Sequence, residues 1–282
     1  LHLSLRRQRQ MCIRDRGIYD SLDIKIDFIT YASATDRDAA FLSGKLDGML
    51  TDYPGATLLQ AKGSRLRLVM ETDGSLSLIA SKKSNVRNPD DLKGKNISVS
   101  GNTFVEYATD EVMKRACLHP GEVNKPEINN IPLRLMMLED GQISASFLPG
   151  PATAIALNDG HTALLNTRQM GLRCTGIVFS EKAITEKDEE IRRFITGYNL
   201  GVKYLQTRPQ NEWTEILVKE FGLQEKAAMQ IDLPDYRPAT RPSYHDIEKI
   251  IAWLKSKGSI PDYYPGENLV DTTFIPGTLK PQ

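Results

Sequence analysis

Short apolar segments alternate with polar, glycine-rich turns along most of the chain. Residues 22 to 29 alternate apolar and polar side chains, which is the period-two pattern of a strand. Five further strands are expected at Leu46–Leu50, Arg67–Met70, Leu76–Ala80, Asn96–Ser100 and Gly176–Ser180. Helical spacing of apolar residues predicts helices at Asp38–Leu42, Val105–Ala116, Asp188–Arg208, Asn211–Phe221, Gln224–Gln230 and Tyr244–Lys257. Strands that alternate with helices predict an α/β architecture with largely parallel sheets, which the late helices cover.

Two segments of the chain resemble each other at a constant offset of 97 residues. Residues 44–63 align without a gap with residues 141–160, and glycine, proline and glycine are identical at equivalent positions. Each copy reads as a helix end, a glycine, a buried strand, a proline turn, a helix and a final glycine. Unrelated strand–helix units also share glycine at helix ends and proline in turns. The extended agreement in apolar pattern favours a pair of homologous lobes, and only two copies occur, which excludes a solenoid.

Charge separates the first sixteen residues from the rest. The chain is neutral overall, but residues 1–16 contain five basic residues and one acidic residue. The remainder carries a net charge of −4, which argues against nucleic acid or anionic lipid as the main partner. The segment LHLSLRRQRQMCIRDR resembles a translated sequencing adapter, and the alternative is a native basic arm or a remnant of a targeting sequence. We treat residues 1–16 as an artefact, so the missing signal peptide gives no evidence on location.

Motifs of enzymes and metal sites are missing from the sequence. GxSxG, HExxH, a P-loop and GxGxxG do not occur, and the three cysteines and four histidines show no ligand-like or triad-like spacing. Cys117 and Cys174 are expected to be small buried residues, and His161 an exposed loop residue. The sequence therefore predicts a protein that is not an enzyme and that needs no cofactor or metal.

Three loops that follow expected strands are candidates for ligand binding, because ligands of open α/β sheets bind outside the carboxyl ends of strands. Each loop also has an ordinary structural interpretation: SGNT can be an N-cap, and TDYPG and LPGP can be turns. The first and third loops are equivalent in the repeat, so they are expected to face each other across one cleft. The candidate residues are Thr51, Asp52 and Tyr53, then Ser100, Gly101, Asn102 and Thr103, and finally Pro149, Gly150 and Pro151.

Longer stretches of the chain resemble the SsuA/TauA/NMT1-like solute-binding family. The resemblance is carried by FLSGKLDGMLTDYPGATLLQAKG, NPDDLKGKNISVSGNTFVEYATDEVM, MLEDGQISASFLPGPATAIALNDG and the ending AWLKSKGSI with NLVDTTFIP. It covers nearly everything from Gly17 to Pro276. Ser144 and Gly150 depart from it, because the family usually has aspartate and often glutamate there. The family's first strand is expected to be missing, replaced by residues 1–16.

The resemblance implies a type II periplasmic-binding-protein fold, with two α/β lobes joined by a two-strand hinge. Lobe 1 would comprise residues 17–82 and 178–282, and lobe 2 residues 83–177. The chain would return near Thr175, which adds this residue to the ligand-binding candidates. Members of the family bind nitrate, sulfonates, taurine or pyrimidine precursors of thiamine.

The function implied is delivery of a small molecule, anionic or heteroaromatic, to the permease of an ABC importer by hinge closure. The protein would be a monomer, and it would be periplasmic or held outside the cytoplasm by a lipid anchor. Two alternatives share the fold: an NMT1-like enzyme of thiamine-pyrimidine synthesis, which would carry a cysteine cluster, and a ligand-sensing module.

Overall fold

The computed structural model describes residues 1–4, 18–31, 33–207 and 236–275, with the single positions 214, 218, 225 and 229. The described residues form two compact units. Unit 1 contains the described parts of Leu1–Asp73, Cys174–Pro209 and Asp235–Gln282, and unit 2 those of Gly74–Arg173 and Gln210–Pro234. Apart from the four single positions, the helices expected at 211–221 and 224–230 lie outside the described residues.

The chain passes between the units at two points in the described part, after Asp73 and after Arg173. The sequence suggested later crossings, after residues 82 and 177. The strand at Leu76–Ala80 accounts for the first difference, because it pairs with two strands of unit 2. The lobe boundaries inferred from the family resemblance stay a prediction.

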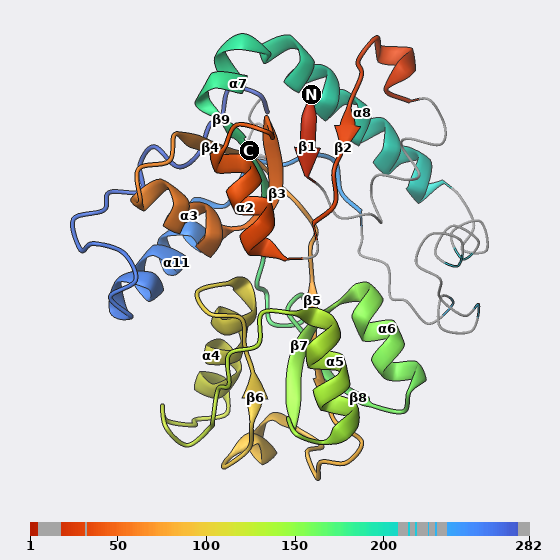
Figure 1. Cartoon of the computed structure of the whole chain (residues 1–282), viewed down its shortest axis with the longest axis vertical. Coiled ribbons are helices and arrows are strands. Elements are labelled where there is room, and N and C mark those ends of the chain that lie inside the picture. The colour runs from red at the N-terminus through yellow and green to blue at the C-terminus, as the bar shows by residue number, and fades with distance from the viewer. Residues whose placement is uncertain are drawn as a thin grey trace, which may run out of the picture. The chain divides into compact units, whose positions relative to one another are not determined.

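Unit 1 is built around a five-stranded sheet with the order β2-β1-β3-β9-β4 (Figure 1). The strands are β1 His2–Ser4, β2 Asp27–Phe28, β3 Gly48–Asp52, β4 Leu66–Glu71 and β9 Thr175–Ser180. β1 runs parallel to both β2 and β3, whereas β9 is antiparallel to β3 and β4. Four of the five strands therefore run in one direction, as expected for a largely parallel sheet, and only β9, which follows the return from unit 2, runs against them among the described strands.

Residues 2–4 form the strand β1, so a part of the segment expected to replace the family's first strand is itself a strand of this sheet. Leu3 is fully buried, and the backbone carbonyls of Leu1 and Leu3 accept hydrogen bonds from Asp27 and Ile29 at 2.8 and 2.9 Å. One apolar side chain between two polar neighbours suffices to fill this central position of the sheet. The assignment of residues 1–16 as an artefact stays a prediction, and residues 5–16 lie outside the described part.

Helices cover the sheet of unit 1 and complete its core. Their bounds are η1 Asp20–Leu22, α2 Ala34–Leu42, α3 Tyr53–Ala61, α7 Glu181–Glu186, α8 Asp188–Gln206 and α11 Tyr244–Ser256. The long amphipathic α8 places Ile191, Phe194 and Tyr198 in the same apolar cluster as Leu3 and Phe179. The aromatic rings of Phe179 and Phe194 meet edge to face with centroids 6.0 Å apart, a favourable aromatic geometry. α11 packs against α3 (Figure 1).

The strand expected over residues 22–29 is mostly absent, because only Asp27 and Phe28 extend the sheet. Residues 20–22 instead form the 3-10 helix η1, which ends at Asp23 in a left-handed conformation with φ 52°. This turn directs Leu22 toward Gly197 of α8, where a Cβ atom would lie 3.2 Å from Leu22. Packing against α8 has overridden the period-two pattern.

The proline- and aromatic-rich segment before residue 275 lies along the edge of β4. Leu68 donates its N–H to the carbonyl of Leu269 at 2.7 Å, and Asp271 donates back to Leu68 at 3.0 Å. Leu269 itself is fully buried. Covering an edge strand in this way satisfies its backbone groups and blocks pairing with other chains.

Unit 2 is built around a four-stranded sheet with the order β6-β7-β5-β8. The strands are β5 Leu76–Ala80, β6 Ile97–Ser98, β7 Ala145–Pro149 and β8 Thr162–Asn166, and the helices are η2 Pro89–Leu92, α4 Phe104–Arg115, α5 Ile131–Asp140 and α6 Gly150–Asn158. β6 and β7 are parallel neighbours, and β5 runs antiparallel to both β7 and β8, so β6, β7 and β8 share one direction. Leu138 of α5, Leu148 of β7 and Ala152 of α6 share one apolar cluster.

The sequence repeat corresponds to a repeat of structure at the same offset. β3 and α3 span residues 48–52 and 53–61, and β7 and α6 span residues 145–149 and 150–158, so every boundary differs by 97. The paired glycines agree as well: Gly44 and Gly141 have φ 77° and 76°, values that favour glycine at helix ends. No helix in the described part of the chain is long and apolar enough to cross a membrane.

Candidate functional site

The first candidate loop of unit 1 is shorter than the sequence suggested. No separate turn follows β3, because α3 begins directly at Tyr53 with Pro54 in its first turn. The carboxylate of Asp52 accepts the N–H of Gly55 at 2.8 Å and so caps the helix. Thr51 is buried, and its hydroxyl accepts a hydrogen bond from Arg37 at 3.3 Å. Asp52 therefore has a structural role as the N-cap of α3, which does not exclude a second role in binding.

Tyr53 belongs to a buried polar group at the carboxyl end of β4. Its ring is fully buried, and its hydroxyl donates to the carboxylate of Glu71 at 3.1 Å. Burial, followed by the charge of Glu71, raises the pKa of Tyr53 well above its ordinary value. The phenol is therefore neutral and fixed as the donor to Glu71.

Thr175 joins the same end of the sheet, because it lies opposite Asp52 in the β3–β9 register. Its hydroxyl lies 2.9 Å from the hydroxyl of Thr72 and 3.0 Å from the Thr72 carbonyl. The structure thus brings four of the predicted residues of unit 1 together at one edge, namely Thr51, Asp52, Tyr53 and Thr175. Thr175 is buried, so its side chain now fastens two strands to each other.

In unit 2 the loop at residues 100–103 joins β6 to α4. Thr103 is the N-cap of α4, and its hydroxyl accepts the N–H of Val105 at 3.2 Å while donating to the carbonyl of Ser100 at 2.7 Å. Asn102 has a left-handed backbone with φ 54°, a conformation that asparagine tolerates better than most residues. The hydroxyl of Ser100 donates to Asn129 at 2.7 Å. The loop is held by its own hydrogen bonds.

Two carboxylates of the protein itself lie at the loop of residues 100–103. The N–H of Asn102 donates to Glu106 at 2.7 Å, and Glu106 is buried in the first turn of α4. The carboxylate of Glu127 packs against Gly101, where an added Cβ atom would lie 2.8 Å from its Oε1. The positive end of α4 is already neutralised by the protein's own acids. Lys125 lies 3.5 Å from the carboxylate of Glu106, so part of this negative charge is compensated.

The third loop, at residues 149–151, begins α6 without a side-chain cap, since Pro149 occupies the N-cap position and Pro151 the first turn. Gly150 stands between the two prolines. Because β6 and β7 are parallel neighbours, this loop and the loop at 100–103 leave the sheet at the same edge. The structure therefore groups the candidates of unit 2 together, and separately groups those of unit 1.

Sequence reasoning missed an ion-pair cluster beside Tyr53. Arg237 donates from Nε to Asp73 at 3.0 Å and from Nη2 to Glu71 at 3.1 Å. Glu71 is the last residue of β4 and Asp73 follows two residues later, so these acids, like the other candidates, lie at the end of a strand. Arg237 carries no such signal, because it lies 164 residues further along the chain than Asp73.

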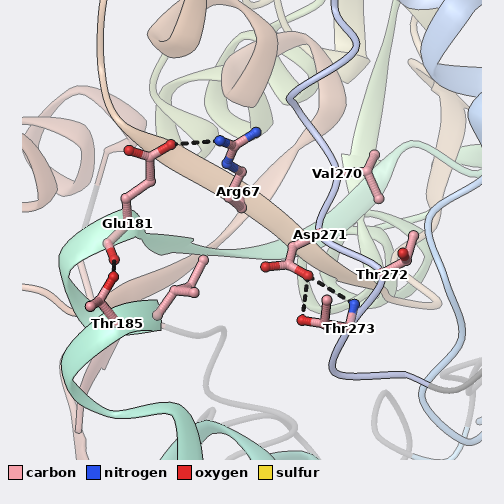
Figure 2. Close-up of a pocket in the computed structure, with 8 residues that line it drawn as sticks. Arg67, Glu181, Thr185, Val270, Asp271, Thr272 and Thr273 are labelled. Atoms are coloured by element: carbon pink, nitrogen blue, oxygen red, sulfur yellow. Dashed lines mark hydrogen bonds and ion pairs between the residues drawn. The ribbon is translucent and has the colours of Figure 1, made fainter.

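A separate pocket of about 490 Å³ lies at the other end of the same strands (Figure 2). It is lined by Arg67, Glu181, Ile184, Thr185, Val270, Asp271, Thr272 and Thr273. Its polar side chains bind one another: Arg67 pairs with Glu181 at 2.8 Å, and Asp271 accepts hydrogen bonds from Thr273. None of the predicted ligand-binding residues lines this pocket.

His161 is buried in unit 2, which corrects the expectation of an exposed loop residue. Its Nδ1 accepts the backbone N–H of Lys82 at 3.0 Å, and its Nε2 lies 3.1 Å from Glu139. Cys174 is buried as expected, but Cys117 is exposed. Within the described residues, no group of three or more histidine, cysteine, aspartate or glutamate residues is arranged to hold a metal.

Comparison with models of protein families assigns the chain to a family. The model described as NMT1/THI5 like matches residues 12–212, more than half of the sequence. The chain belongs to the NMT1/THI5-like family. No curated protein sequence matches it. The family assignment agrees with the resemblance inferred from the strand and turn motifs, and it covers both candidate loops of the repeat.

Solved structures show the same fold. A ligand-binding component of an ABC-type import system from Staphylococcus aureus, with zinc bound, has a TM-score of 0.78 at 14% identity, covering 97% of this chain and 96% of that one. The alkanesulfonate-binding protein SsuA from Xanthomonas axonopodis pv. citri, bound to MOPS, has a TM-score of 0.78 at 16% identity, with 93% and 94% covered. The desulfurization enzyme DSZB has a TM-score of 0.70 at 12% identity, with 97% of each chain covered. The fold is that of periplasmic binding proteins, and an enzyme shares it.

Proposed function

We propose that this NMT1/THI5-like protein is the solute-binding component of an ABC importer, and that it binds one small molecule without converting it. The observation that carries the proposal is the matched pair of strand–helix turns at offset 97, one in each unit, in a chain with the fold of periplasmic binding proteins. Loops at the carboxyl ends of strands are where such sheets bind ligands. The candidate residues in both units remain part of this proposal.

The proposed mechanism is closure of the two units on the ligand about the strands that connect them. Ligand contacts to both units would stabilise the closed form, and closure would present the protein to a permease. The chain crosses between units at residues 73–74 and 173–174. We further propose that the protein acts outside the cytoplasm, in the periplasm or on a lipid anchor, and as a monomer.

An enzyme is the second candidate, because DSZB shares the fold over 97% of both chains. An enzyme of thiamine-pyrimidine synthesis would need the cysteine cluster named above. Cys117 and Cys174 belong to different units, and Cys12 lies outside the described residues. We expect binding without turnover, and this separates a solute-binding protein from an enzyme. A sensing module would bind its ligand in the same way and would differ only in its protein partner.

The test is a thermal-shift screen of the purified chain against named compounds of several classes: nitrate, ethanesulfonate, succinate, uracil and nicotinamide. A ligand that binds only the native state stabilises it, by about 2.7 kcal/mol at a concentration of 100 times Kd. We expect at least one class to raise the melting temperature in a saturable way. A panel in which no compound shifts the melting temperature would contradict the proposed function.

A further inference from the structure

The guanidinium of Arg237 is fixed at the ligand-binding edge proposed for unit 1. Its backbone N–H donates to Oδ2 of Asp73 at 3.0 Å, and its Nε donates to Oδ1 of the same carboxylate at 3.0 Å. Its Nη2 donates to Oε1 of Glu71 at 3.1 Å. Two acids therefore hold the planar group in one orientation, as forked arginine–carboxylate contacts do.

Both acids are themselves buried and anchored. The side chains of Glu71 and Asp73 are 5% and 9% exposed, and Glu71 also accepts the hydroxyl of Tyr53. The backbone beside Arg237 is fastened to β4 as well, because Glu71 donates its N–H to Thr240 at 2.9 Å. The position of the guanidinium is consequently set before any ligand arrives, which lowers the entropic cost of binding.

The third nitrogen of the Arg237 guanidinium, Nη1, contacts neither acid. The Arg237 side chain is 34% exposed, and within the described residues its Nη1 makes no hydrogen bond. Nη1 carries two N–H groups. A guanidinium that is oriented by two buried acids, on a side chain that is partly exposed, and that has an unused donor is arranged to bind an acceptor from solution.

The charges around Arg237 select the kind of acceptor. Glu71 and Asp73 place two carboxylates in contact with the one guanidinium. An oxyanion bound at Nη1 would also be repelled by two carboxylates that contact the same guanidinium. An uncharged acceptor, such as an amide carbonyl or a ring nitrogen, takes the hydrogen bond without this repulsion.

We propose that Arg237 is a ligand-binding residue of unit 1 and that it donates from Nη1 to an uncharged hydrogen-bond acceptor. The proposal rests on the function proposed above, and it narrows the ligand from small molecules in general to uncharged ones with a carbonyl or ring-nitrogen acceptor. Glu71 and Asp73 are positioning residues, since they act through the guanidinium.

The experiment measures the affinity of wild type, Arg237→Gln and Arg237→Lys for the compounds of the same panel. We expect uracil or nicotinamide, and not nitrate or ethanesulfonate, to bind wild type, and we expect both variants to bind at least tenfold more weakly. Lysine keeps the charge, but its three donors sit on one nitrogen and cannot reproduce the planar fork that contacts both acids and leaves Nη1 for a ligand. Arg193→Gln is the matched control, because Arg193 also lies in unit 1, pairs with two acids and is 37% exposed. It should bind as wild type does.

The outcomes separate this proposal from the function on which it rests. A wild-type protein that binds only nitrate or ethanesulfonate would overturn the proposal while supporting a binding function, and this comparison needs no variant to fold. Unchanged affinity in folded Arg237→Gln, checked by circular dichroism, would overturn it too. A panel without any binder would remove the proposed function and the assignment of Arg237 together.

Discussion

Several residues of the candidate site stabilise the fold through contacts within the protein. Asp52 and Thr103 cap helices, Thr175 joins two strands, and Tyr53 is buried against Glu71. The ordinary interpretation of the TDYPG and SGNT segments thus holds locally. It does not exclude ligand contact, since a capped helix start at a strand end is also where ligands of this kind of sheet bind. Variants must therefore separate folding from binding.

Asn102 allows that separation, because its backbone is left-handed and glycine accepts the same conformation. We expect Asn102→Gly to leave the free energy of unfolding nearly unchanged and to weaken binding of the panel ligand about fivefold, the equivalent of one ordinary hydrogen bond. Calorimetric titration and urea unfolding measure the two effects. Cys117→Gly, at φ 53° in the same unit, is the control that should change neither. Equal affinity of Asn102→Gly and wild type would make the loop a cap only.

At the scale of elements, His161 fastens three parts of unit 2. It lies just before β8, accepts a hydrogen bond from Lys82 in the segment after β5, and contacts Glu139 of α5. Burial lowers the pKa of His161, and the nearby Lys82 lowers it further, although Glu139 and Asp159 act in the opposite direction. The acceptor role of Nδ1 explains why the neutral ring is favoured, since a proton there would remove the bond from Lys82.

A pKa that is lowered in the folded state makes stability depend on pH in a defined direction. The unfolded chain takes up the proton first as pH falls below about 6.5, so the contribution of His161 is present above that pH and is lost below it. We expect the free-energy difference between wild type and His161→Asn to shrink from pH 7.5 to pH 5. Asparagine offers an acceptor to Lys82 but does not titrate in this range. Urea unfolding at several pH values measures the difference, and a constant gap would contradict the assignment.

For the whole molecule, the decisive question is whether the bound ligand is chemically converted. A solute-binding protein returns its ligand unchanged, whereas an enzyme with the same fold consumes it. We expect the panel compound that shifts the melting temperature to bind at one equivalent per chain and to be recovered intact after prolonged incubation, as measured by mass spectrometry. Loss of the compound in proportion to time and protein concentration would favour the enzyme. A heat-denatured sample is the control for chemical decay.

The extent of sequence-based prediction differs between the parts of this molecule. Local patterns sufficed for β5, α4, α8 and α11, each predicted to within about two residues, because apolar periodicity and capping residues are local signals. They also sufficed for the repeat and for the family, whose motifs stand in continuous stretches of sequence. The loops that end the strands were identified for the same reason, although whether they bind ligand stays a prediction.

Tertiary structure decided what depends on distant segments. The antiparallel entry of β9 and β5 into their sheets, the burial of Leu3 in a central strand and the burial of His161 each need partners far along the chain. So does the contact of Arg237 with Asp73, which closes a loop of 164 residues. A sequence pattern records which residues are apolar or polar, but which charges meet is set by the packing of the whole unit. The candidate loops were therefore visible in the sequence, and the donor proposed to recognise the ligand was not.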